Sequence, residues 1–247
     1  MNILITGATS GIGRELAVSY HKDGNLVIAL GRNLGALKEL TEMGIDTFQV
    51  DLTNLDELLQ VAVQITERYH HLDIAILNAG TCEYIDISQF DARLVARVMN
   101  ANVLSFANSV QAVLPLLRNS LVKHLVGTAS MAGYLPLPRA EAYGASKAAV
   151  QYLLENLAID LAGEGFTVTT INPGFVKTPL TQKNDFPMPF MVEVATAVKI
   201  IKLGITDKKT EIHFPYRLTL PMKFLALLPK PIWRRLGRRF IKKQLTK

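Results

Sequence analysis

The sequence predicts a single doubly wound α/β domain, with a parallel sheet of about seven strands and helices on both faces. Short apolar segments of strand length alternate with amphipathic segments of helix length along most of the 247 residues. These apolar segments are almost uninterrupted, as expected for strands that helices cover on both sides. A glycine-rich turn directly follows the first strand, and a basic helical tail closes the chain.

The first strand is expected at residues 2–6, and Gly7 to Gly13 form the turn after it. A helix over residues 11–21 and an apolar strand at 26–30 complete a βαβ unit. In this setting glycines let the backbone approach a pyrophosphate, and the helix N-terminus offers free N–H groups and a positive dipole. The opening of the chain therefore predicts a dinucleotide site.

The alternation continues beyond this unit without a linker or an internal repeat. Further strands are expected near 45–50, 72–77, 121–127, 166–171 and 211–214, and further helices near 33–42, 54–69, 88–117, 142–163 and 190–203. We therefore expect one cofactor-binding and catalytic domain over 1–215 and a basic amphipathic extension over 216–247.

Composition narrows the class of protein. No apolar run reaches the roughly 18 residues that suggest a transmembrane helix, and no secretory signal is evident at the N-terminus. A single cysteine, Cys82, fits a reducing compartment, so a cytoplasmic protein is expected. The five histidines show no metal-ligand spacing, and no metal site is predicted.

Polar and small residues follow successive strands where each strand ends. Arg32 follows the second strand and Asp51 the third, Asn78 to Gly80 follow the fourth, and Ser130 follows the fifth. Parallel strands meet at one edge of the sheet, and ligands bind there. Turn chemistry explains any one of these positions but not the whole series.

Tyr143 and Lys147 are four residues apart on an expected helix, so both side chains lie on one face. A phenol is a poor acid or base at neutral pH, and a neighbouring ammonium lowers its pKa. The pair therefore predicts a proton-transfer site.

Together these motifs resemble those of the short-chain dehydrogenase/reductase family, which has a Rossmann fold. The matching residues are Thr6-Gly-x-x-x-Gly-x-Gly13, Asp51, Asn78-Ala79-Gly80, Asn102, Ser130, Tyr143-x-x-x-Lys147, Pro173-Gly174 and Thr178. The resemblance implies an oxidoreductase in which Tyr143 is the general acid or base and Ser130 positions the carbonyl oxygen. It implies that Lys147 binds the nicotinamide ribose and lowers the Tyr143 pKa, and that Asn102, rather than Asn100, helps to hold a water.

The resemblance also implies a set of cofactor contacts. They are Gly7, Ser10, Gly11, Ile12, Gly13, Arg32, Asp51, Leu52, Asn78, Ala79, Gly80, Tyr143, Lys147, Pro173, Gly174, Val176 and Thr178. Arg32 stands where a carboxylate would select NAD(H), so NADP(H) is favoured. Ser10 departs from the second basic residue of many NADP-preferring relatives, and Arg14 is either a replacement for it or a solvated helix charge.

The segment after Thr178 is expected to be a mobile flap over the substrate, as in the family. Its large apolar side chains, and others after Ser130, favour a small or lipophilic ketone or alcohol, such as a keto lipid or a 3-oxoacyl compound; packing of the flap itself is the alternative. The residues concerned are Phe186, Met188, Phe190, Met191, Tyr134, Leu135 and Leu137.

Charge is concentrated at the C-terminus. Residues 1–211 carry 17 basic and 21 acidic side chains, whereas residues 212–247 carry 10 basic side chains and no acidic one. On a helix after Pro231, Ile232, Trp233, Leu236 and Phe240 share one face, with Arg234, Arg235, Arg238, Arg239 and Lys242 mostly opposite. This pattern predicts peripheral association with an anionic membrane, or docking of the apolar face on the body or a second subunit.

Two further expectations concern partners, and one concerns an alternative function. Binding of nucleic acid through the tail is not expected, because clustered basic charge alone discriminates poorly. A homodimer or tetramer through the helices near 88–117 and 142–163 is expected by family analogy. The alternative function is a non-catalytic nucleotide-binding sensor or scaffold, which has no need of Ser130, Tyr143, Lys147 and Asn102.

Overall fold

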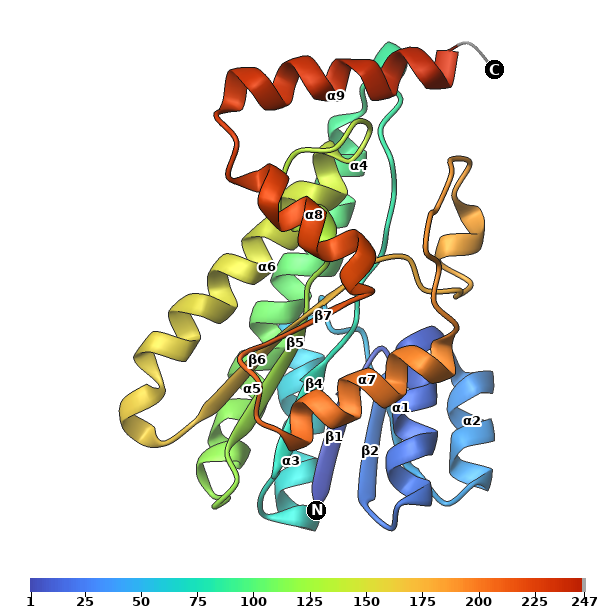
Figure 1. Ribbon diagram of the computed structural model, residues 1–247. Helices are drawn as coiled ribbons and strands as arrows, with labels where there is room; N and C mark the ends of the chain where they lie inside the picture. Colours follow the sequence, from blue (N-terminus) through green and yellow to red (C-terminus); the bar gives the residue numbers. More distant parts are fainter. Residues whose placement is uncertain (246–247) are drawn as a thin grey trace.

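The computed structural model describes residues 1–245, with side chains through residue 238. In this range seven parallel strands form one sheet in the order β3-β2-β1-β4-β5-β6-β7 (Figure 1). The strands are β1 (Asn2–Thr6), β2 (Leu26–Gly31), β3 (Asp46–Gln49), β4 (Ile74–Leu77), β5 (His124–Thr128), β6 (Thr167–Pro173) and β7 (Glu211–Phe214). The order reverses between β1 and β4, and the predicted doubly wound fold is confirmed.

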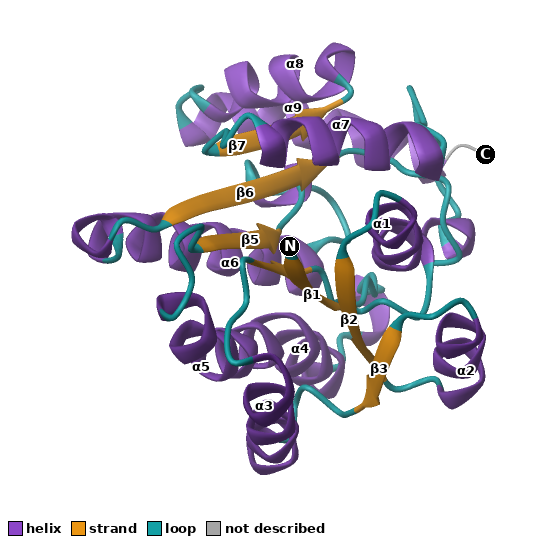
Figure 2. Ribbon diagram, turned by 90° about the horizontal axis from the view of Figure 1, so that it is seen from below, coloured by secondary structure: helices purple, strands orange, loops and turns teal. Residues whose placement is uncertain are grey.

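Helices cover both faces of the sheet, and the two layers are separated in Figure 2. One layer contains α1 (Gly11–Lys22), α2 (Leu34–Glu42) and α7 (Val194–Thr206). The other contains α3 (Leu55–Tyr69), α4 (Ala92–Met99), α5 (Ser105–Arg118) and α6 (Glu141–Asp160). The chain ends with α8 (Tyr216–Ala226) and α9 (Lys230–Leu245).

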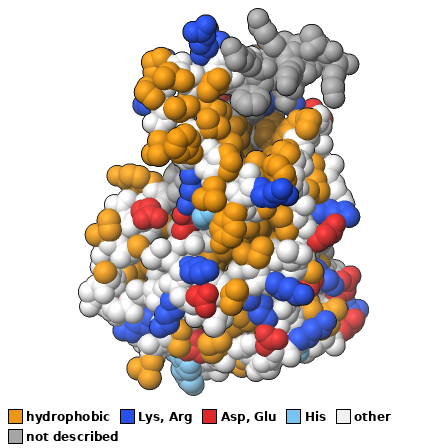
Figure 3. All heavy atoms as spheres, in the orientation of Figure 1, with side chains coloured by type: hydrophobic (Ala, Val, Ile, Leu, Met, Phe, Trp, Pro, Cys, Tyr) orange, Lys and Arg blue, Asp and Glu red, His pale blue; other side chains and the backbone are white. Residues whose placement is uncertain are grey.

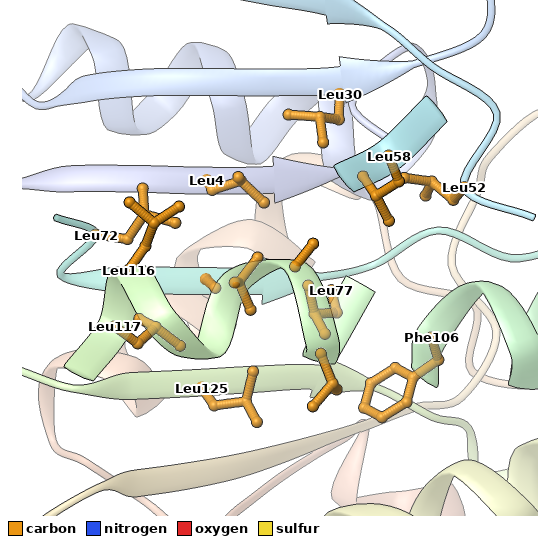
Figure 4. Packing of buried hydrophobic residues seen from close by; sticks show 14 of the residues in the cluster. Leu4, Leu30, Leu52, Leu58, Leu72, Leu77, Phe106, Leu116, Leu117 and Leu125 are labelled. Carbon is orange, nitrogen blue, oxygen red and sulfur yellow. The ribbon is translucent and has the colours of Figure 1, made fainter. Parts of the chain in front are cut away.

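Alternation along the strands explains the two layers. Ile3 and Ile5 of β1 pack against the layer of α1 and α7, whereas Leu4 packs against that of α3 and α5. The second of these cores is drawn in Figure 4, where Leu4 and Leu30 of the strands form one cluster with Leu58 of α3 and Leu116 of α5. Both faces are therefore apolar, which is why the strands read as continuous hydrophobic runs.

The single helix predicted near 88–117 is wrong. The helix begins at Ala92, because Asp91 lies before it as an N-cap and accepts a hydrogen bond of 2.8 Å from the Arg93 N–H. A π-helical turn, Asn100–Leu104, then separates α4 from α5. Such turns occur frequently at functional sites, and this one contains Asn102.

The C-terminal extension is built against the body of the protein. α8 packs against β7, where Lys223 forms an ion pair with Glu211. Trp233 of α9 is only 8% exposed, and its Nε1 donates a 2.8 Å hydrogen bond to the Pro136 carbonyl. For Trp233 the docked alternative is therefore correct, and the prediction that it faces a membrane is wrong.

Other residues of the predicted apolar face differ from Trp233. Ile232 is 50% exposed and Leu236 is half-buried, while the side chains of Arg239, Phe240 and Lys242 lie outside the described residues. Within residues 1–245, none of the helices has the length and apolar character needed to cross a bilayer. The domain boundary at residue 215 stays a prediction.

A buried histidine at the start of β5 makes stability depend on pH. The Thr169 hydroxyl donates to the Lys209 carbonyl at 2.6 Å, so it accepts from His124 Nε2–H at 2.8 Å. Burial lowers the pKa of His124 from 6.5 to about 4, and the positive charge of Lys208 acts in the same direction. The unfolded chain therefore takes up this proton first, and stability is lost as pH falls from 6.5 towards 4.

We expect this residue to contribute a loss of about 2 kcal/mol of unfolding free energy between pH 7 and pH 5. Urea unfolding of the wild type and His124→Gln at both pH values measures it. The variant should lack this part of the pH dependence, whatever its stability at pH 7. Parallel pH dependences would contradict the assignment.

Candidate active site

A cleft of about 470 Å³ runs along the carboxyl ends of β1 to β6, and we call it the main cleft. Nearly all of the predicted cofactor contacts line it. These residues are Gly7, Ser10, Gly11, Ile12, Arg32, Asp51, Leu52, Asn78, Ala79, Gly80, Tyr143, Lys147, Pro173, Gly174, Val176 and Thr178, with the predicted catalytic Ser130. Gly13 and Asn102 do not line it, but they contact residues that do.

The turn after β1 is shaped for a close backbone approach. Gly7 has φ +65, and a Cβ there would lie 2.8 Å from the Ala79 Cα. At Gly13 a Cβ would lie 2.3 Å from the Gly7 carbonyl oxygen, so this glycine packs α1 onto the turn. The Ser10 side chain makes no cap hydrogen bond to α1, and its first turn holds no acidic residue. The N–H groups and the positive end of α1 are thus open to an anion, which fits a pyrophosphate.

Thr6 joins this turn to the loop after β4. Its hydroxyl oxygen accepts hydrogen bonds from the backbone N–H groups of Asn78 and Ala79, at 3.0 and 3.1 Å. The Thr128 hydroxyl donates a longer bond of 3.4 Å to the Asn78 amide oxygen. These contacts hold three strand ends together across the cleft.

Arg32 lies at the mouth of the cleft with its side chain 76% exposed, 3.9 Å from Asp51. The Asp51 carboxylate accepts hydrogen bonds from the Thr53 N–H and hydroxyl at 2.9 and 2.8 Å, and the backbone bond is the main cause that lowers its pKa. Arg14 instead pairs with Glu39 of α2 at 2.9 Å and does not line the cleft. Of these two guanidinium groups, only that of Arg32 therefore lines the main cleft.

Tyr143 and Lys147 share one face of α6, as their spacing predicts. Lys147 Nζ donates a 2.9 Å hydrogen bond to the Thr128 carbonyl and lies 6.0 Å from the centre of the Tyr143 ring. Burial lowers the pKa of Lys147 to about 8. Lys147 is thus poised near neutral pH, within reach of the phenol.

The expected lowering of the Tyr143 pKa by Lys147 is not what the structure gives. Burial raises the pKa of the phenol, the nearby Cys82 adds to this, and a hydrogen bond with the Ser130 side chain lowers it in part. The reason is that the phenol lies in an apolar wall, where removal from water disfavours the phenolate. In this structure the phenol is held as a proton donor.

Ser130 begins a short helical turn, where its Oγ accepts from the Ala132 N–H at 3.1 Å. Its carbonyl accepts a 2.8 Å hydrogen bond from Gln151 Nε2, which also donates to the Asn172 side chain at 2.7 Å. Asn172 donates in turn to Glu211 at 2.8 Å. A polar chain thus joins the serine turn to β7.

Asn102 is buried behind the cleft. Its Oδ1 accepts from the Thr81 N–H at 2.7 Å, and its Nδ2 donates to the Thr81 carbonyl and to Ser146 Oγ, each at 2.9 Å. Asn100, its alternative, is exposed. The contacts of Asn102 fix the loop after β4 against α6, and its role in holding a water stays a prediction.

A second cavity of about 290 Å³ meets the main cleft, and we call it the apolar pocket. Ser130 and Tyr143 belong to the walls of both cavities. Its other walls come from the loop after β4, the loop before α6, the flap and the C-terminal helices.

Two of the seven residues predicted for substrate contact, Leu137 and Phe186, line the apolar pocket. Phe186 packs edge-on against Tyr84, with ring centres 5.1 Å apart, and the neighbouring Asp185 pairs with Arg139 at 2.8 Å. These contacts close the flap over the pocket.

The other five residues lie elsewhere, and their prediction is wrong for this structure. The Tyr134 hydroxyl binds Glu211 at 2.7 Å, and Leu135 is buried. Met188 Sδ accepts from Asn184, while Phe190 and Met191 are 49% and 41% exposed. These residues are close to Thr178 or Ser130 in the sequence, but that proximity does not determine the direction of each side chain.

Several residues of the two cavities were missed. In the main cleft they are Thr9, Gly31, Asn33, Val50, Thr53, Thr81, Ala101, Ser105, Thr128, Ala129, Pro179, Leu180, Thr181 and Lys183. Most adjoin predicted residues at strand ends, a signal that could have found them. In the apolar pocket, Cys82, Tyr84, Leu218, Met222, Leu225 and Trp233 carried no such signal. In the part of the chain that the structure describes, no cluster of three or more metal-ligating side chains is present.

Comparison with known proteins agrees with this geometry. The family described as short chain dehydrogenase matches residues 1–187. An "Uncharacterized oxidoreductase" of Myxococcus xanthus is 36% identical over 96% of each chain. A 3beta-hydroxysteroid dehydrogenase of Mediterraneibacter gnavus is 33% identical over 85% of this chain and 80% of its own. The crystal structure of a short chain dehydrogenase from Shigella flexneri, complexed with NADP, has a TM-score of 0.77 at 30% identity, and covers 85% of this chain and 93% of that one.

Proposed function

Because this chain belongs to the short chain dehydrogenase family of oxidoreductases, we propose that it interconverts a carbonyl group and a secondary alcohol with NADP(H). The single observation that carries the proposal is the position of Tyr143. Its phenol and the Ser130 hydroxyl lie where the main cleft, suited to a dinucleotide, meets the apolar pocket, suited to a substrate.

Each catalytic side chain has a defined task. In the direction of reduction, Tyr143 donates its proton to the carbonyl oxygen, and in oxidation it takes the proton back. Ser130 donates a hydrogen bond to the same oxygen and stabilises the charge that develops on it. Lys147 holds the nicotinamide ribose beside Tyr143, while Asn102 keeps the wall behind them in place and helps to hold a water. When bound, the nicotinamide supplies or accepts the hydride.

A lipophilic substrate is supported by the walls of the apolar pocket. Side chains such as Phe186, Met222 and Leu225 line it, and Arg139, its one basic wall residue among those described, is engaged by Asp185. The Mediterraneibacter relative is named for a steroid, which is also a lipophilic alcohol. A screen of ketones from short to long chain, followed by oxidation of NADPH, tests the proposal. No turnover of any carbonyl by enzyme that binds NADPH would instead favour a nucleotide-binding sensor or scaffold.

NADP(H) preference rests on Arg32 and on the NADP held by the Shigella relative. We expect Arg32→Ala to weaken NADPH binding by about 1.5–3 kcal/mol, because a charge-assisted hydrogen bond to the 2′-phosphate is lost. NADH binding should change little. Fluorescence titration of both nucleotides measures the difference.

Arg14→Ala is the matched control, since that guanidinium pairs with Glu39 outside the main cleft. It should leave both affinities near those of the wild type. An Arg32→Ala variant weakened equally towards NADPH and NADH would show that Arg32 does not bind the phosphate.

We also propose an oligomeric state and a location for this protein. We expect a homodimer or tetramer through α4, α5 and α6. Exposed Tyr152 and Ile159 of α6, and Leu104 of the π-helical turn, offer apolar contact. The single cysteine supports a cytoplasmic location, and the basic C-terminal segment supports peripheral association with an anionic membrane. Nucleic-acid binding is not proposed.

A further inference from the structure

Helix α8 is apolar on two opposite faces. Leu218, Met222 and Leu225 point inward and form part of the wall of the apolar pocket. On the other side, Leu220 and Phe224 are 54% and 71% exposed. A helix of a globular protein normally has one apolar stripe, which faces the core, so the second apolar face of α8 is left without cover.

The exposed apolar surface continues past the end of α8. Leu227, in the turn to α9, is 81% exposed, and Ile232 in the first turn of α9 is 50% exposed. Figure 3 shows hydrophobic side chains gathered in this upper left part of the molecule, with basic atoms at its top. We call Leu220, Phe224, Leu227 and Ile232 the outer apolar surface.

Basic residues adjoin this surface without acidic partners. Lys230, Arg234, Arg235 and Arg238 of α9 are exposed, and among the described side chains none of them forms an ion pair with an acidic residue. No acidic residue occurs anywhere in 212–247. Most arginines of the body form ion pairs with acidic residues, whereas these three arginines and Lys230 remain available to an external anion.

Trp233 sets the orientation of α9. Its hydrogen bond to Pro136 directs this face of the helix to the body and leaves the arginines outward, beside the outer apolar surface. Apolar side chains flanked by arginines and lysine suit the interface of an anionic bilayer. A second copy suits it less, because a two-fold contact here would bring two basic clusters together.

We propose that the outer apolar surface and the four basic residues of α9 dock on an anionic lipid bilayer. We propose further that the substrate is a lipid ketone or alcohol that passes from this bilayer around α8 into the apolar pocket. α8 contributes to both the outer apolar surface and the pocket wall, and a helix with its side chains is about 10 Å across. The second step rests on the proposed reaction, and the first names the surface for the membrane association that was proposed with it.

Co-sedimentation with vesicles of phosphatidylglycerol and phosphatidylcholine tests the docking step. We expect the full chain to bind these vesicles at low salt, to bind pure phosphatidylcholine far less, and to dissociate at high salt. Phe224→Ser with Leu227→Ser should reduce binding at least tenfold. Leu34→Ser with Val63→Ser, at residues that are 63% and 57% exposed on α2 and α3, should leave binding unchanged.

Charge is tested separately. Arg234, Arg235 and Arg238 changed together to Gln should reduce affinity about fivefold per residue, from about 1 kcal/mol each. Lys38, Lys199 and Lys208 changed to Gln carry the same loss of net charge and should have little effect, since they lie away from this surface. Equal losses in the two triple variants would overturn the docking surface.

Activity on soluble and vesicle-borne ketones distinguishes failure of the docking from failure of the proposed function. All surface variants should reduce a short water-soluble ketone at the wild-type rate, while turnover of a long-chain ketone carried in anionic vesicles falls with vesicle binding. A wild type that stays in the supernatant at low salt overturns the docking. So does a dimer that Phe224→Ser and Leu227→Ser dissociate without any effect on vesicle binding. If neither the wild type nor any variant reduced the water-soluble ketone, the proposed function would be overturned instead.

Discussion

Tyr143→Phe is expected to lose about 10²- to 10⁴-fold in turnover, because general acid–base catalysis contributes that much and a phenyl ring has no proton to transfer. Burial holds the phenol protonated, and Tyr143 lies in the walls of both cavities together with Ser130. Thr181 also lines both, but its hydroxyl donates to the Val176 carbonyl at 2.5 Å. NADPH affinity should stay within a few-fold of the wild type. Steady-state rates on the best ketone, with a separate titration of NADPH, measure both quantities.

Tyr152→Phe is the matched control on the same helix. Tyr152 is 73% exposed and removed from both cavities, so this variant should keep the wild-type rate. A Tyr143→Phe enzyme within a few-fold of the wild type would remove Tyr143 from the reaction.

Lys147→Ala is expected to damage both binding and turnover. Loss of the ammonium removes a charge-assisted contact to the nicotinamide ribose, of about 1.5–3 kcal/mol in NADPH affinity. Turnover should fall further, because the nicotinamide ribose is then no longer held beside Tyr143. Nucleotide titration and single-turnover rates separate the two losses.

The pH profile gives a second readout for Lys147. Burial lowers its pKa to about 8, so the ammonium is present below that pH and is lost above it. We expect NADPH affinity of the wild type to decline as pH rises through about 8, and Lys147→Ala to lack this decline. Lys199→Ala, an exposed lysine of α7, is the control and should keep the wild-type profile. An unchanged decline in Lys147→Ala would assign the titration to another group.

The main cleft was largely predictable from sequence, because its residues are local to strand ends. Parallel strands bring their carboxyl ends to one edge, so Gly7, Asp51, Asn78 and Ser130 had to meet once the alternation was recognised. The pairing of Tyr143 with Lys147 needed only helical periodicity. The direction of the Tyr143 pKa did not follow in this way, since it depends on how much water the surrounding walls remove.

The apolar pocket was much less predictable. Leu137 and Phe186 were found, but Tyr84, Met222 and Trp233 were not. The first precedes α4 and the last two follow β7, so only the packed fold brings them to Tyr143. Side-chain direction in an irregular loop has no period, which is why Phe190 and Met188 were placed wrongly.

What the sequence alone determined is therefore the doubly wound sheet, the glycine turn, the order of residues along the cleft and the basic character of the C-terminus. These follow from periodicity and from the rule that parallel strands share an edge. Only the tertiary structure decided that Trp233 seals α9 to the body, and that α8 lines the apolar pocket with one face and leaves the other exposed. The physical reason is that periodicity defines which side of a helix is apolar, whereas the surface that covers it comes from residues about 100 positions away, as Pro136 does for Trp233.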